Sequence, residues 1–82
     1  MRFVWDEPKR LSNRTKHGLD FADVESGFDW ANASVTPAKD GRFKALGKLN
    51  RKTVVVIFAT LGTEAFSIVS LRRASRGERN AK

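Results

Sequence analysis

The stretch RFKALGKLNRKTVVVIFATLGTEAFSIVSLRR, residues 42–73, contains three strand patterns in succession. In residues 42–49 one face carries three cations and the other is mostly apolar, which is typical of a half-buried strand. Residues 53–60 are apolar on both faces and so belong in the middle of a sheet, and residues 64–71 alternate again. Because only short turns separate these segments, the sequence predicts an antiparallel meander of three strands.

Two helices are predicted before the meander. Residues 6–18 favour a helix that is capped by Asp6 and closed by Gly18 in a left-handed conformation. Its apolar stripe is thin, so it should lie on the surface. A second helix is expected to begin near Asp20. Its buried face consists of Phe21, Val24 and Phe28, at helical spacing.

Shorter elements complete the prediction. Residues 2–5 alternate and indicate a first strand, and residues 33–35 allow another before the meander. Residues 75–78, SRGE, form a capping-box signature that predicts a short terminal helix. We therefore expect one α+β domain over residues 1–82, in the order strand, helix, helix and four strands, with a short C-terminal helix. The sheet should be antiparallel, with the helices packed on one face.

Composition excludes several classes of protein. The chain has 82 residues, no cysteine and one histidine, so neither a disulfide framework nor an ordinary zinc site is expected. We predict no metal and no cofactor. The N-terminus has no apolar signal segment, and the longest apolar run, residues 54–59, is too short to span a bilayer. The expected location is therefore the cytoplasm, without membrane contact.

The positive charge is concentrated in the second half of the chain. The net charge is +7, of which residues 1–41 contribute −1 and residues 42–82 contribute +8. Such a distribution favours a polyanionic partner, because neutralising phosphates releases condensed counterions. Nucleic acid is the favoured partner, although an anionic protein or membrane surface would also be attracted.

Arginines gather where the last predicted strand ends. Arg72 and Arg73 should point to opposite faces of the sheet, so that one of them joins Arg42, Lys44 and Lys48 on the same face. Solubilising charges at a strand end would explain them, but the planar guanidinium also binds phosphate through two hydrogen bonds. The exclusive use of arginine at positions 72, 73, 76 and 79 favours phosphate binding.

Several blocks together resemble the BrnT family of bacterial type II toxins. They are VWDEPKRLSNRTKHGLDF, RFKALG and SIVSLRRASRGER, in this order along nearly the whole chain. Such toxins are similar to RelE-type ribonucleases, which cleave messenger RNA without a metal and are neutralised by an antitoxin. The resemblance implies a RelE-like α+β fold with RNA at the cationic side of the sheet. Its motifs fall on Lys16, His17 and Gly18, on Arg42 and Phe43, and on Ser70, Arg72, Arg73, Ala74, Ser75 and Glu78.

Cleavage of RNA through its own 2′-hydroxyl needs proton transfer and cations that stabilise the crowded phosphorane. Histidine is the side chain that ordinarily titrates near neutrality, so His17 is the proton-transfer candidate, although it could instead complement the helix dipole. Arg42, Arg72 and Arg73 are expected to clamp the phosphate. Lys16, Lys44, Lys48 and Arg76 are expected to bind RNA, while a solvated strand face is the plainer role for Lys44 and Lys48.

An alternative is a module that binds RNA or an antitoxin without turnover and acts in promoter autorepression. Family members often carry an aromatic hydroxyl followed by Glu-Arg where this chain has FATLGT, residues 58–63, and the chain has no tyrosine. This departure favours the alternative. The expected partners are a cognate antitoxin of acidic character, RNA that is free or on the ribosome, and operator DNA only through the antitoxin.

Overall fold

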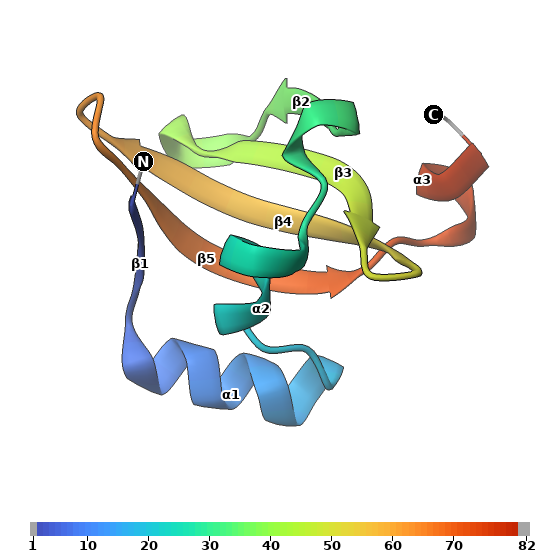
Figure 1. The fold of residues 1–82 in the computed structure, drawn as a ribbon, viewed down its shortest axis with the longest axis horizontal. Coiled ribbons are helices and arrows are strands. Elements are labelled where there is room, and N and C mark those ends of the chain that lie inside the picture. Colours follow the sequence, from blue (N-terminus) through green and yellow to red (C-terminus); the bar gives the residue numbers. More distant parts are fainter. Residues whose placement is uncertain (1, 81–82) are drawn as a thin grey trace.

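The computed structural model describes residues 2–80, which form one five-stranded sheet with three α-helices around it (Figure 1). Within these residues, no helix has the length and apolar character needed to cross a membrane. The predicted order of strands and helices is confirmed. The elements are β1 (Arg2–Trp5), α1 (Glu7–His17), α2 (Ala22–Gly27), β2 (Ser34–Pro37), β3 (Phe43–Leu49), β4 (Lys52–Leu61), β5 (Ala65–Arg73) and α3 (Arg76–Asn80), with 3-10 turns at Trp30–Asn32 and Lys39–Gly41.

The sheet is mixed, with the strand order β1-β5-β4-β3-β2. The meander of β3, β4 and β5 is antiparallel as predicted, and β2 pairs antiparallel with β3. β1 runs parallel to β5, with Arg2 opposite Ala65 and Trp5 opposite Ile68, so the prediction of a fully antiparallel sheet is wrong at this edge. After Trp5 the chain enters α1, which continues along the same edge of β5. β1 must therefore run in the direction of β5.

The hydrophobic core lies between α2 and one face of the sheet, which we call the core face. Phe21 and Val24 are fully buried, and Phe28 is 7% exposed, so the predicted buried face of this segment is confirmed. Phe28 packs over β3 at Gly47, where a Cβ atom would lie only 2.9 Å from the Phe28 ring. A glycine is thus needed at this position of β3, because any side chain there would displace the aromatic ring.

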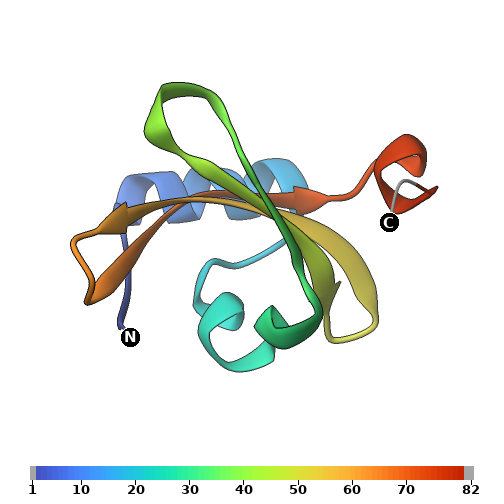
Figure 2. The same cartoon turned by 90° about the horizontal axis from the view of Figure 1, so that it is seen from above.

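α1 lies along the β5 edge of the sheet, whereas α2 covers the core face (Figures 1 and 2). The prediction that the helices share one face is therefore wrong for α1. The buried side chain of Asn13 joins α1 to β5. Its Nδ2 donates to the carbonyl of Leu71 at 2.8 Å, and its Oδ1 accepts from the N–H of Leu71 at 3.1 Å. Asn13 thus extends the hydrogen-bond ladder of β5 past the point where β1 ends.

A network of ion pairs fixes α1 to the segment that follows it. Arg10 Nε donates to Asp20 Oδ1 at 2.7 Å, and Arg10 Nη2 donates to Asp20 Oδ2 at 3.0 Å. Arg10 also pairs with Glu7 at 2.6 Å. Hydrogen bonds from Arg10, and then from the N–H of Ala22, lower the pKa of Asp20 to about 2. Asp20 therefore favours the folded state most strongly when it is ionised.

Stability is expected to fall in acid partly through Asp20. Its pKa is lower in the folded chain than in the unfolded chain, so its contribution is present above about pH 4 and is lost as the pH falls towards 2. The Asp20→Asn variant should be less stable than wild type at pH 7. Its melting temperature should also fall less between pH 5 and pH 2. Thermal unfolding followed by circular dichroism measures both effects, and Asp23→Asn is the exposed control. An equal fall in melting temperature between pH 5 and pH 2 in wild type and Asp20→Asn would contradict this account.

Candidate functional site

The face of the sheet opposite the core face carries cations from two strands, and we call it the cationic face. The strand register places Lys44 beside Ile57 and Arg72 beside Val55 on this face. Lys48 lies on it as well, four residues beyond Lys44 in the same alternation. Of the two adjacent arginines at the end of β5, Arg72 is thus the one that joins the lysines of β3.

Glu78 of α3 contacts both β3 and β5 across the cationic face. Its two carboxylate oxygens accept hydrogen bonds from Arg72 Nη1 and Nη2 at 2.8 and 2.9 Å. Lys44 Nζ lies 2.6 Å from Glu78 Oε2, the oxygen that also contacts Arg72 Nη2. The side chains of Lys44 and Arg72 keep about a third of their surface exposed. The two cations therefore converge on one anion at a point that solvent still reaches.

The capping box predicted at the start of α3 is present and orients Glu78. The N–H of Ser75 donates to Glu78 Oε1 at 2.8 Å, and the N–H of Glu78 donates to Ser75 Oγ at 3.2 Å. Hydrogen bonds from Arg72, then Lys44 and Ser75, hold the pKa of Glu78 well below its usual range. The same pairing raises the pKa of Arg72. Glu78 is thus a weak base at neutral pH, and its carboxylate neutralises part of the cationic face.

The remaining predicted cations are more widely spread. Arg42 has an extended backbone and directly precedes β3, so alternation places it on the cationic face, two residues before Lys44. Arg73 is opposite Val54, a residue of the core face, and its side chain is exposed. Arg76 begins α3 and is also exposed. The structure therefore groups Arg42 with Lys44 and separates Arg73 from both.

A hollow of about 230 Å³ lies between α1 and β5, and we call it the α1 hollow. Ser70 belongs to both regions, because it lines the hollow and also lies beside Ile57 on the cationic face. It stands two residues before Arg72 on β5. The hollow therefore adjoins the cationic face at the edge of the sheet. Its lining consists of Lys9, Ser12, Asn13, Lys16, His17, Val69 and Ser70.

Three polar residues that α1 contributes to the hollow, Lys9, Ser12 and Asn13, were not predicted as site residues. Lys9, Asn13 and Lys16 recur at the i, i+4 and i+7 spacing of one helix face, and this stripe is the signal that could have revealed Lys9 and Asn13. The β5 side of the hollow has no comparable signal. A register shift at Ile57 and Phe58 leaves Val69 without a partner on β4, and a bulge of this kind depends on how two strands pair.

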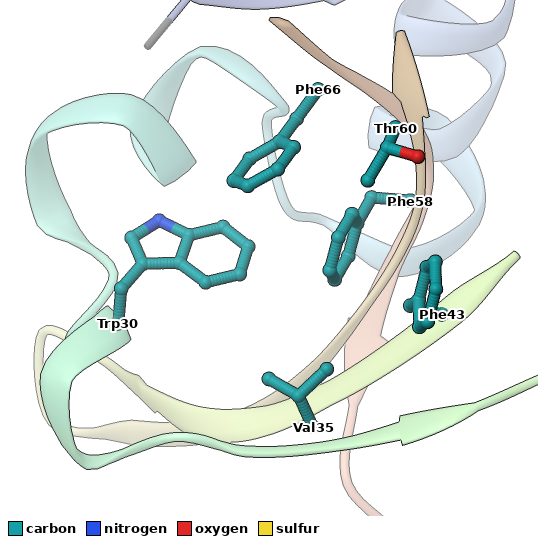
Figure 3. Close-up of a pocket in the computed structure, with 6 residues that line it drawn as sticks. All are labelled: Trp30, Val35, Phe43, Phe58, Thr60 and Phe66. Carbon is teal, nitrogen blue, oxygen red and sulfur yellow. The ribbon is translucent and has the colours of Figure 1, made fainter. Parts of the chain in front are cut away.

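An apolar groove of about 290 Å³ lies on the core face (Figure 3). Phe28, Phe58 and Phe66 surround the Trp30 indole, with ring centroids 4.7 to 5.6 Å from its own. This tryptophan is therefore part of the aromatic packing. The residues that line the groove are Trp30, Val35, Phe43, Phe58, Thr60 and Phe66.

The fold and the cationic face define a small α+β domain suited to binding polyanions. Residues 5–78 match the family described as "Ribonuclease toxin, BrnT, of type II toxin-antitoxin system". The chain belongs to this family, as its sequence motifs predict.

A solved structure supports the assignment. The chain is similar to the protein in the 1.1 Å crystal structure of the Brucella abortus ribonuclease toxin, BrnT, at 46% sequence identity and a TM-score of 0.82. The similarity covers 93% of this chain and 99% of that one. Comparison with curated protein sequences gives no match. The α+β fold and the ribonuclease toxin family thus rest on both sequence and structure.

Proposed function

We propose that this chain is a metal-independent endoribonuclease that cleaves messenger RNA through attack of the RNA's own 2′-hydroxyl and is neutralised by a cognate antitoxin. One observation carries the proposal. Lys44 and Arg72 converge on a single carboxylate oxygen, so both cations reach one anion at hydrogen-bonding distance. A phosphate oxygen offers the same charge and acceptor geometry. Messenger RNA as substrate implies a cytoplasmic location.

The proposed catalysis depends mainly on charge. During attack by the 2′-hydroxyl, negative charge builds up on the non-bridging oxygens of the phosphate, and fixed cations stabilise it. Arg72 would bind two of these oxygens through its planar fork, with Lys44 on one of them. Arg42, two residues before Lys44, would hold a neighbouring phosphate. Arg73, which lies on the other face, has no part in this arrangement.

Proton transfer is assigned to His17. This side chain lines the α1 hollow, which adjoins the cationic face at Ser70. Glu78 lies closer to Arg72, but its lowered pKa makes it a poor proton acceptor. Glu78 has a different role in this proposal, because RNA must compete with it for Lys44 and Arg72. The RelE-type mechanism expected from the sequence is compatible with this division of roles.

A second candidate function is a binding module that grips RNA or its antitoxin without turnover. Such a module would act in autorepression, with operator DNA contacted through the antitoxin. The observation in its favour is that Glu78 already occupies the anion position between Lys44 and Arg72. The absence of tyrosine from the chain points the same way.

Cleavage of a labelled single-stranded RNA in EDTA by the purified chain, freed of antitoxin, separates the two functions. A ribosome-loaded message is tested in parallel, since the substrate could be bound to the ribosome. We expect products with 2′,3′-cyclic phosphate ends. Salt-sensitive RNA binding without cleavage in either format would instead establish the binding module.

The α1 hollow is expected to contact RNA phosphates through its two lysines. Each phosphate contact on a single strand contributes about 0.7 to the slope of log K against log salt concentration. The Lys9→Ala/Lys16→Ala double variant should therefore bind RNA more weakly, with a slope smaller by about 1.4. Fluorescence anisotropy across a salt series measures the slope. The Lys39→Ala/Lys52→Ala variant removes equal charge outside the hollow, and an identical slope change in both variants would exclude specific phosphate contacts there.

A further inference from the structure

β2 forms one edge of the sheet and has backbone groups that no other strand of residues 2–80 pairs with. All four of its residues are exposed. The N–H of Ala38 donates to the carbonyl of Arg42 at 2.8 Å, and hydrogen-bonded pairs alternate along an antiparallel ladder. Thr36 therefore directs its backbone groups towards β3, and Val35 directs its N–H and C=O groups away from the sheet. The outer side of β2 thus offers a donor and acceptors to another strand.

The two faces next to this edge differ in character. Val35 is 49% exposed, and its side chain points into the apolar groove together with Phe43 (Figure 3). On the opposite face, Thr36 lies beside Lys44, and Arg42 follows the same alternation. A strand added outside β2 would place alternate side chains against the apolar groove and near the cations of β3.

We propose that β2 and the apolar groove bind an extended segment of the cognate antitoxin, which adds to the sheet as a sixth strand and alternates apolar with acidic side chains. This inference rests on the toxin-antitoxin function. An apolar side chain of the segment fills the groove beside Val35, while acidic neighbours face Lys44 and Arg42. RNA does not fit this surface, because its phosphates are drawn to the cationic face and its backbone forms no β-ladder.

The segment explains how one partner could neutralise the proposed ribonuclease. Strand addition supplies main-chain hydrogen bonds, and the groove selects the side chain pattern. Acidic side chains near Lys44 would then oppose the approach of phosphate by like charge. A single strand buries less than the roughly 1,200 Å² of a standard interface. The segment is thus one part of a larger contact.

Hydrogen exchange of the wild-type chain, free and in its antitoxin complex, tests the pairing directly. We expect the Val35 amide to exchange rapidly in the free chain and at least 10-fold more slowly in the complex. Unchanged exchange of Val35 in the complex would overturn the proposal. So would equal protection by single-stranded RNA alone. Protection that appears in the free chain as its concentration rises would show that a second copy, and not the antitoxin, covers β2.

Two variants at adjacent positions separate this surface from the RNA site. Val35→Asp places a carboxylate at the mouth of the groove and should weaken antitoxin binding at least 10-fold. Thr36→Ala, at the neighbouring exposed position on the other face, leaves both the groove and the charge unchanged, so it is the control and should keep the affinity within about 2-fold of wild type. Both positions are exposed, and unfolding curves verify that the variants fold. RNA binding by Val35→Asp should equal that of wild type. Loss of both RNA binding and antitoxin binding would show that the variant misfolds. Unchanged antitoxin affinity of Val35→Asp would contradict binding of the antitoxin in the groove.

A synthetic peptide gives an independent test of the side chain pattern. The probe is a nine-residue peptide that alternates valine and glutamate, and its control has the same composition in two blocks. We expect only the alternating peptide to shift the amide resonances of Val35 and Phe43 in a titration. Equal shifts with both peptides would show non-specific attraction of acidic chains to a basic protein and would contradict the proposal.

Discussion

Arg72→Ala is expected to lower kcat/KM for RNA cleavage by at least about 100-fold, the usual effect of removing one preorganised group that stabilises charge in a transition state. The guanidinium reaches the anion position on the cationic face with two N–H groups, and Lys44 supplies only one ammonium there. Arg72→Lys keeps the charge but loses the paired geometry, so its activity should lie between those of wild type and Arg72→Ala. Initial rates on a labelled RNA measure the effect.

Arg72 also holds α3 through Glu78, so a structural loss must be separated from a catalytic one. Glu78→Gln breaks the same ion pair while leaving both cations in place. If Arg72→Ala acted only by loosening α3, Glu78→Gln would lose as much activity. We expect it to keep or gain RNA affinity, because the competing carboxylate is gone. Arg79→Ala removes an exposed arginine of α3 that makes none of the contacts among Lys44, Arg72 and Glu78, so it should leave the rate within about 2-fold of wild type.

Asn13→Ala is expected to lower the free energy of unfolding by about 3 kcal/mol. The variant leaves the N–H and C=O groups of Leu71 without their partner at a site where Asn13 is only 8% exposed. Each unsatisfied buried polar group costs roughly 1 to 3 kcal/mol. The Asn13 amide also donates to the carbonyl of Leu19 at 3.3 Å, so the loop after α1 loses a contact as well. Urea unfolding measures the loss.

The neighbouring residue provides the control for Asn13. Ser12→Ala removes an exposed hydroxyl from the same helical turn and should change stability by less than about 0.5 kcal/mol. Asn13→Asp keeps an acceptor for the Leu71 N–H but directs a carboxylate at the Leu71 carbonyl, so it should be destabilised as well. Near-wild-type stability of both Asn13 variants would show that water replaces the amide and that α1 is held in another way.

Local patterns were sufficient to predict the elements of this fold. Alternation identified the strands of the meander, Gly18 ended α1 with a φ of 71°, and the Ser75 to Glu78 signature formed its capping box. These features depend on residues that are close in sequence, so the sequence contains the information directly. Alternation also predicted that one of Arg72 and Arg73 joins the β3 cations, but not which one. Arg72 alternates with the core residue Ile68, and only the register shift at Ile57 and Phe58 places it on the cationic face.

Contacts between distant residues could not be predicted in this way. The direction of β1 and the position of α1 both depend on the pairing of Asn13 with Leu71, which no local pattern shows. The convergence of Lys44 on Glu78 similarly depends on where α3 folds back. The resemblance to the family identified motif residues, yet it did not show which of Arg72 and Arg73 lies on the same face as Lys44.

The pairing of β1 with β5 has a consequence for synthesis on the ribosome. β1 is translated well before its partner, since Arg2 lies opposite Ala65. A nascent chain that stops before β5 has one strand without a neighbour, and it also lacks Arg72 and Glu78. Truncated copies, such as those made from a broken message, therefore have neither a complete sheet nor the Arg72 that the proposed catalysis requires beside Lys44. Only a fully translated chain is expected to be toxic.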